Sequence, residues 1–160
     1  MSTEKDPLEK QARNLVTGSS ILSISLHRSF SQKSTEIERN FDKWEFYATI
    51  AGVYYGVAGL AVEVLPDRNR YDSLNAAIHE GLDVWNRDGR RALSDCSRVV
   101  NGELLAVQHA DPETRARTAA ASLGCWVLAN VLSRKLSENE FDVAAQIGSM
   151  IIIQLDKWWS

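Results

Sequence analysis

The sequence has few residues that could cross-link or rigidify a fold. It contains two cysteines and three prolines in 160 residues. Cys96 and Cys125 stand far apart without a C-x-x-C spacing, so neither a zinc site nor a disulfide framework is predicted, and we expect two reduced thiols. A chain of this length buries enough surface on folding to sustain a core without such cross-links. We therefore expect a single domain spanning residues 1–160.

An excess of positive charge is also missing. The formal net charge is -3 and the isoelectric point is about 5.6. Proteins that hold nucleic acid by bulk charge are usually strongly basic, so nucleic-acid binding is not expected. The charged N-terminal stretch "MSTEKDPLEKQAR" lacks the apolar centre of a secretory signal. We expect a cytoplasmic protein.

Common catalytic signatures are absent from the sequence. Its three histidines, His27, His79 and His109, lie in separate segments, and there is no H-E-x-x-H, P-loop or nucleophile-elbow pattern. A dinucleotide-binding loop follows a strand, and no strand is expected ahead of the glycines between positions 52 and 59. These absences favour a binding function without a cofactor over catalysis.

The periodicity that is present is helical. Apolar residues recur at intervals of three and four, without sustained alternation, which predicts an all-α protein. Four helix starts are marked by an N-cap residue with a following proline or glutamate, at Asp6, Thr35, Asp111 and Ser137. Asp88-Gly89 and Asn101-Gly102 indicate breaks. We predict a bundle of five to six helices at about 7–29, 35–65, 69–87, 90–100, 112–135 and 138–158.

Four of these helices contain charge-free runs, of which the longest is "FYATIAGVYYGVAGLAV", residues 46–62. A helix of seventeen residues rises about 26 Å, less than the ~30 Å hydrocarbon thickness of a bilayer. Acidic residues also stand close to both of its ends. We therefore expect helix 35–65 to be a buried central helix, apolar all round, rather than a stable membrane span. The other runs are at 14–26, 118–133 and 143–155.

Three glycines, Gly52, Gly56 and Gly59, make this central helix rich in glycine. Each interior glycine costs about 1 kcal/mol of helix stability relative to alanine, so this side of the helix must require the absence of side chains. Close helix crossing, within one subunit or across a two-fold dimer interface, is the favoured explanation. A small-molecule cavity, with the hydroxyl groups of Tyr54 and Tyr55 facing a ligand, is the alternative.

The C-terminal stretch "MIIIQLDKWWS" carries apolar residues on two sides of its helix. Aromatic residues and methionine are enriched where partners bind, although Trp158 and Trp159 could equally cover the core of their own subunit. The leading hypothesis is a non-catalytic interaction protein that forms a homodimer. The residues expected in close packing or association are Gly52, Gly56, Gly59, Trp158 and Trp159.

Two acidic pairs supply an alternative function. Asp42 and Glu45 lie in "DKWE", and Glu80 and Asp83 lie in "HEGLD". Carboxylates three residues apart share a helix face, and two facing pairs could hold Mg²⁺ or Mn²⁺. This pattern is similar to the paired acidic motifs of the all-α MazG-type nucleotide pyrophosphatases, although it has aspartate for glutamate in the first motif and a longer interval. The resemblance implies a metal-dependent nucleotide or phosphoester hydrolase, whereas solvated helix faces are the favoured explanation.

A basic turn is the last feature of note. Arg87, Arg90 and Arg91 fall within "NRDGRR". Arginine side chains bind phosphate and carboxylate groups in a bidentate manner, so this turn is a candidate anion site. A solvated turn is again the favoured explanation.

Overall fold

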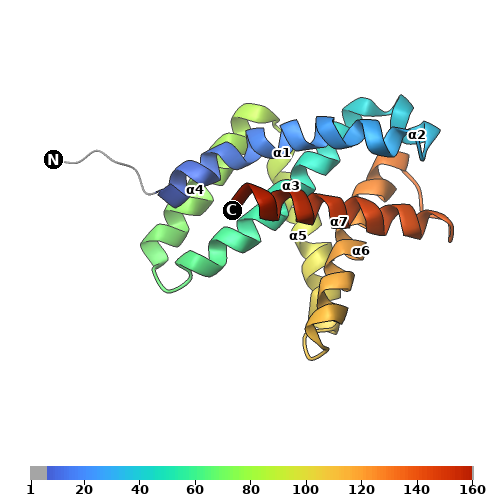
Figure 1. Cartoon of the computed structure of the whole chain (residues 1–160). Helices are drawn as coiled ribbons and strands as arrows, with labels where there is room; N and C mark the ends of the chain where they lie inside the picture. The colour runs from blue at the N-terminus through green and yellow to red at the C-terminus, as the bar shows by residue number, and fades with distance from the viewer. Residues whose placement is uncertain (1–6, 160) are drawn as a thin grey trace.

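The chain is all-α. The computed structural model describes residues 7–159, and those residues form helices and connecting turns without a strand. This confirms the fold class that the periodicity predicted. The helices are arranged as shown in Figure 1. Their bounds are α1 Pro7–Ser31, α2 Thr35–Arg39, α3 Phe41–Val64, α4 Arg68–Trp85, α5 Gly89–Ala106, α6 Pro112–Leu132 and α7 Glu140–Trp159.

The described residues form seven helices rather than five to six, because the predicted helix 35–65 is divided at Asn40. The backbone of Asn40 has φ -110° and ψ 49°, outside helical geometry. Its side-chain amide and its backbone N–H both donate to the carbonyl oxygen of Glu36, at 2.8 and 3.1 Å. Such local bonds by asparagine compete with helix continuation. The preceding helix is capped by Ser34, not by Thr35, through a bond from the N–H of Ile37.

The expected break at Asn101-Gly102 is absent, and α5 continues to Ala106. The Asn101 amide donates to the hydroxyl of Ser97 at 3.0 Å and its oxygen accepts from the hydroxyl of Tyr54 at 2.5 Å. The first bond joins neighbouring turns of α5, the second ties α5 to α3, and α5 also packs on α6. The cost of about 1 kcal/mol for a helical glycine is therefore tolerated at Gly102.

Two predicted helix starts are found in the structure. The Asp111 carboxylate accepts the N–H of Thr114 at 2.7 Å, as expected of an N-cap. The Glu140 carboxylate accepts the N–H of Ser137 at 2.8 Å, which is one half of a capping box. The start predicted at Asp6 lies outside the described residues.

Helix α3 lies against every other helix of the described chain. Its Trp44 is fully buried, and the indole N–H donates to the carbonyl oxygen of Ser23 on α1 at 2.7 Å. Towards its C-terminal end one side is uncovered, because Gly59 is exposed and Val62 is 69% exposed. Phe41–Val62 is long and apolar enough to cross a membrane. Core helices pass the same test, so length and composition do not distinguish the two.

Helices α5 and α6 form a hairpin that projects from the remaining helices (Figure 1). From residue 101 to residue 119 no side chain is buried. Nearer its base, the hairpin is joined by the indole N–H of Trp126, which donates to the carboxylate of Asp95 at 2.9 Å. The core therefore lies at the base of the hairpin, around α3, and the tip is a solvent-exposed arm.

Candidate functional site

Helices α1 and α7 run side by side in opposite directions across α3 (Figure 1). Their direction follows from two contacts. Lys33, just after α1, hydrogen-bonds Gln146 near the start of α7. Near the other end, the Trp158 indole of α7 lies over Gly18 of α1, at 3.6 Å from where a β-carbon of that glycine would stand.

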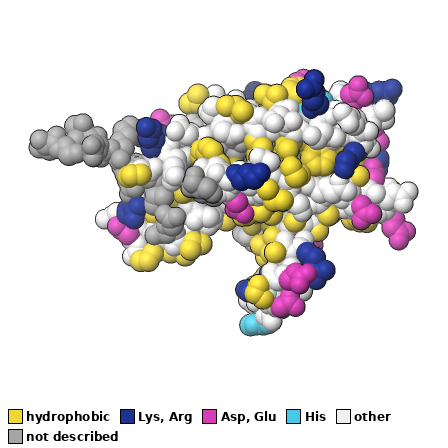
Figure 2. Space-filling view, viewed as in Figure 1, with side chains coloured by type: hydrophobic (Ala, Val, Ile, Leu, Met, Phe, Trp, Pro, Cys, Tyr) yellow, Lys and Arg dark blue, Asp and Glu magenta, His cyan; other side chains and the backbone are white. Residues whose placement is uncertain are grey.

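An open groove of about 460 Å³ lies between these two helices. Its apolar lining comes from Leu26 and Phe30 of α1 and from Ala145 and Met150 of α7. Figure 2 shows hydrophobic side chains gathering over α1 and α7 on this side of the molecule. We call the exposed surface of α1 and α7, including the groove between them, the α1/α7 face.

Large apolar side chains remain exposed on this face. Ile21 and Ile24 of α1 are 63% and 49% exposed. Ile153 and Trp158 of α7 are 46% and 40% exposed. The charge-free runs 14–26 and 143–155 explain the exposure of the three isoleucines, because each helix turns one side to the core and has apolar rather than charged residues on the other. An apolar surface of this kind is typical of an association site.

The glycines expected to mediate association have different surroundings. Gly52 and Gly56 are buried against α1 of the same chain. A β-carbon on Gly52 would lie 2.8 Å from the hydroxyl oxygen of Ser19, and one on Gly56 would lie 2.5 Å from a methyl carbon of Leu15. These two positions therefore admit the neighbouring helix, whereas Gly59 lies on the exposed side of α3.

The two tyrosines considered for a cavity wall point away from this glycine packing. The Tyr54 hydroxyl donates to Asn101 of α5, and the Tyr55 hydroxyl donates to Asp156 of α7 at 2.6 Å. Of the tryptophan pair, Trp158 belongs to the α1/α7 face. The side chain of Trp159 lies outside the described residues.

The four carboxylates of the alternative metal site are not brought together. Asp42 and Glu45 lie in the first turns of α3, and Glu80 and Asp83 lie on α4. Glu80 borders the contact of α4 with α1, whereas Asp83 forms an ion pair with Arg90 at 2.6 Å. Among the residues that the structure describes, no three His, Cys, Asp or Glu side chains form a group that could hold a metal ion.

The arginines of the basic turn differ in their surroundings. Arg87 and Arg91 are exposed at the α4–α5 junction. Arg90 borders a cleft between α3, α4 and α5 and is held there by its bond to Asp83. Of the three arginines, Arg90 is the one that lines this cleft.

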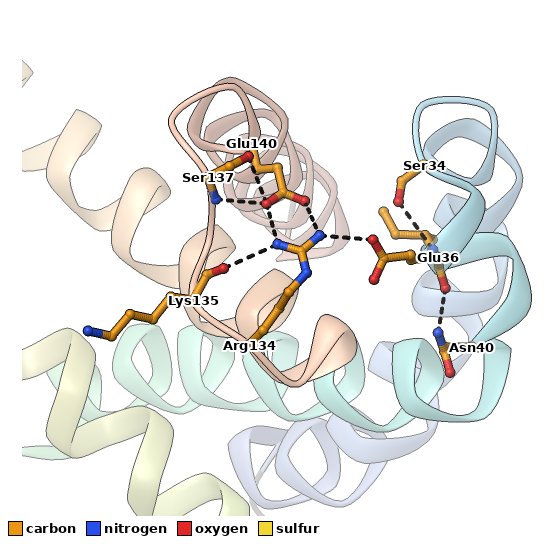
Figure 3. A network of polar contacts seen from close by, with 8 residues as sticks. Ser34, Glu36, Asn40, Arg134, Lys135, Ser137 and Glu140 are labelled. Carbon is orange, nitrogen blue, oxygen red and sulfur yellow. Dashed lines mark hydrogen bonds and ion pairs between the residues drawn. The ribbon is translucent and has the colours of Figure 1, made fainter.

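Sequence reasoning missed a polar network around Arg134, in the connection from α6 to α7 (Figure 3). Its guanidinium donates to both carboxylate oxygens of Glu140, at 2.7 and 2.9 Å, and to Glu36 of α2 at 2.8 Å. These bonds, with those from Ser137, lower the pKa of Glu140 to about 2. The capping pattern indicated Glu140, but no local signal pairs Arg134 with a residue as distant as Glu36.

Comparisons of the chain with protein-family models, curated proteins and solved structures found no match. Function is therefore inferred from the surface and the packing of this molecule alone.

Proposed function

We propose that this protein is a non-catalytic interaction protein that forms a homodimer through the α1/α7 face. The observation that carries this proposal is that α1 and α7, which share one apolar groove, each expose large apolar side chains: Ile21 and Ile24 on α1, and Ile153 and Trp158 on α7. Burying apolar surface contributes roughly 25 cal/mol per Å² to the free energy of association. A partner that covers these side chains is therefore stabilised on this face.

Exposed charges on the two helices favour a second copy as the partner. Helix α1 exposes Arg28, and α7 exposes Asp142. A two-fold axis can place α1 of one subunit on α7 of the other, and each contact then occurs twice. Opposite charges would meet in both copies of that contact, which sets orientation even where it adds little affinity.

The proposal moves the interface away from the glycines. Because Gly52 and Gly56 already accommodate α1 within the subunit, they are unsuited to contact a second chain. The outward isoleucines of α1 and α7 take their place. Trp158 supplies the aromatic residue that interfaces commonly contain.

The test is the mass in solution as a function of protein concentration, measured by sedimentation equilibrium for the wild type and for charged variants. Ile24→Glu and Ile153→Glu place a carboxylate on the α1/α7 face and should yield monomers at concentrations where the wild type is dimeric. Leu105→Glu is the matched control, because Leu105 is 64% exposed but lies on the projecting hairpin. It should dimerise like the wild type.

Circular dichroism spectra and melting temperatures should be close to wild type for all three variants, since each side chain is about half exposed or more. A wild-type chain that is monomeric throughout the micromolar range would contradict the proposal. Equal loss of dimer in Leu105→Glu would show that the interface lies elsewhere.

A further inference from the structure

A second concave site lies between α3, α4 and α5, on residues that the α1/α7 face does not use. It is an open cleft of about 330 Å³. We call it the polar cleft. A volume of this size is within the range of small-molecule sites, which combine an apolar surface with a few convergent polar groups. Here the apolar part is Val57, Ala58 and Leu93.

Each polar side chain named below can donate a hydrogen bond into the cleft. Arg90 and His79 are joined there by the hydroxyl groups of Tyr71 and Ser94 and the amide of Asn75. Among the described residues that line the cleft there is no aspartate or glutamate, although the whole chain has a net charge of -3. Arg90 therefore brings a guanidinium to the cleft, and its counter-ion Asp83 lies beside the cleft rather than on its wall. Clefts lined by one sign of charge attract ligands of the opposite sign.

One wall of the cleft is held in place by a chain of hydrogen bonds. The Tyr54 hydroxyl donates to the Asn101 oxygen at 2.5 Å, and the Asn101 amide donates to the Ser97 hydroxyl at 3.0 Å. Burial raises the pKa of Tyr54 to about 12, so this hydroxyl keeps its proton at neutral pH. The wall is thus preorganised, and a ligand would not have to order it.

Arg90 is held in place by one ion pair and keeps further hydrogen-bond donors. Its Nη2 atom donates to the Asp83 carboxylate at 2.6 Å, and both side chains are about half exposed, at 53% and 52%. A guanidinium carries five N–H donors in a planar fork, so further donors remain for a second acceptor. Asp83 does not line the cleft and acts as a counter-ion beside it.

We propose that the polar cleft binds a small organic anion, whose carboxylate or phosphate group is held by Arg90 and whose polar body contacts the hydroxyl and amide groups of α3, α4 and α5. Bidentate bonds from arginine to such groups are among the stronger polar contacts in proteins. The proposal is independent of the dimer, because none of the cleft residues belongs to the α1/α7 face. It also assigns different roles to the three arginines, since Arg87 and Arg91 do not line the cleft.

The ion pair gives the proposal a distinctive consequence. Asp83 competes with any bound anion for the Arg90 guanidinium. Removing the guanidinium should weaken binding, whereas removing the carboxylate of Asp83 should strengthen it. A purely structural role of this ion pair would not change anion affinity in opposite directions.

The experiment is a titration of the full-length ¹⁵N-labelled chain with citrate and, separately, with inorganic phosphate, at constant ionic strength, followed by amide chemical shifts. We expect saturable shifts confined to amides of α3, α4 and α5 around the cleft. Citrate and phosphate separate the two head groups, carboxylate and phosphate. Saturable binding of either supports the proposal, and saturable binding of neither overturns it.

Variants then test the role of Arg90. Arg90→Gln should raise Kd about tenfold, as expected for loss of a charged hydrogen-bond donor. Arg91→Gln, one residue further along α5 and outside the cleft, removes the same charge and should leave Kd within about twofold. Equal weakening by the two variants would mean non-specific attraction and would overturn the assignment. Amide dispersion in the same spectra reports whether each variant is folded.

The opposite change is tested on α4. Asp83→Asn should lower Kd several-fold because Arg90 loses its competitor. Glu80→Gln is the matched control, since Glu80 lies on the same helix but borders α1 rather than the cleft. If Asp83→Asn binds no tighter than Glu80→Gln, Arg90 is not the group that holds the anion.

Discussion

Gly124 of α6 stands directly against Ala144 of α7, backbone to backbone. A β-carbon on Gly124 would lie 1.6 Å from the carbonyl oxygen of Ala144. The contact is reciprocal, because a β-carbon on Gly148 would lie 1.7 Å from the carbonyl oxygen of Ala120. The backbones of α6 and α7 approach so closely here that a β-carbon fits at neither glycine.

Alanine at Gly124 should therefore destabilise the protein by about 3 kcal/mol or more, because backbone cannot move aside as a side chain can. Gly102→Ala is the control, since among the described residues the added carbon meets nothing within 4 Å beyond the backbone of its own helix. It should stabilise by up to about 1 kcal/mol through helix propensity. Urea unfolding of both variants measures the difference. Similar free energies of unfolding would contradict the close crossing.

Gly56→Ala should cost less, about 1 to 3 kcal/mol, because the added carbon meets the flexible end of Leu15. Leu15→Ala alone should cost about 2 to 5 kcal/mol by leaving a cavity. In the double variant the new methyl group fills part of that cavity, so the loss should be smaller than the sum of the two. Denaturant unfolding of all four chains measures this coupling. Strict additivity would be evidence that the two residues are not in contact.

The Arg134 network should make stability sensitive to acid. The pKa of Glu140 falls from 4.5 to about 2 in the folded chain, so its stabilisation is complete above the ordinary value and is lost as pH falls from about 4.5 to 2. At neutral pH, Glu140→Gln should cost about 1 kcal/mol, given the partial exposure of the ion pair. Between pH 4.5 and 2 the free energy of unfolding of this variant should fall less than that of the wild type.

Glu138→Gln is the control for this pH effect, because Glu138 is exposed and lies in the same connection. Its unfolding curve should follow the wild type at every pH. The pKa of Asp111 is also lowered, by its bonds to Thr114, so the difference between variant and wild type isolates Glu140. Parallel curves for Glu140→Gln and wild type would argue against the network.

The thiols should react slowly and unequally. Cys96 is buried and Cys125 is partly exposed, and burial raises the pKa of both. Since the thiolate is the reactive form, a disulfide reagent at pH 8 should modify Cys125 slowly and leave Cys96 intact until the chain unfolds. Cys125→Ser should abolish the reaction of the folded protein. Rapid release of two equivalents from the folded wild type would refute this order.

Divalent metals should leave the melting temperature unchanged. Asp42 and Glu45 do not form one group with Glu80 and Asp83, and the described residues contain no other group of three such side chains that could hold a metal ion in the folded state. Thermal melts with and without millimolar Mg²⁺ or Mn²⁺ test this. A metal-induced rise that disappears in Glu80→Ala would revive the hydrolase alternative.

The helical class and several helix starts could be read from the sequence because they depend on neighbours. The cap at Asp111 needs only the amide of Thr114, three residues on, and apolar periodicity identifies buried sides without a partner. The bond from Asn40 back to Glu36 is equally local, yet it was missed because asparagine also occurs inside helices. Sequence analysis likewise placed a break at Asn101-Gly102, where bonds to Ser97 and Tyr54 hold the helix together.

The candidate sites were less accessible to such reasoning. Sequence analysis named Arg90 only as one of three arginines in a turn. Which of the three lines the polar cleft depends on how α4 and α5 are rotated about their axes. The α1/α7 face was anticipated only through Trp158, since the sequence does not say which side of a charge-free helix will be covered. The pairing of Arg134 with Glu36 joins segments that only folding brings together.

By itself, the sequence determined that this chain is helical, where several helices begin, and that some glycines must serve close packing. Periods of three and four residues and capping bonds are local, and they act before distant segments meet. Only the tertiary structure decided that Gly52 and Gly56 face α1, that Gly124 meets the backbone at Ala144, and that the four carboxylates stay apart. Those outcomes depend on crossing angles and helix rotations, which are set by the packing of all the helices together.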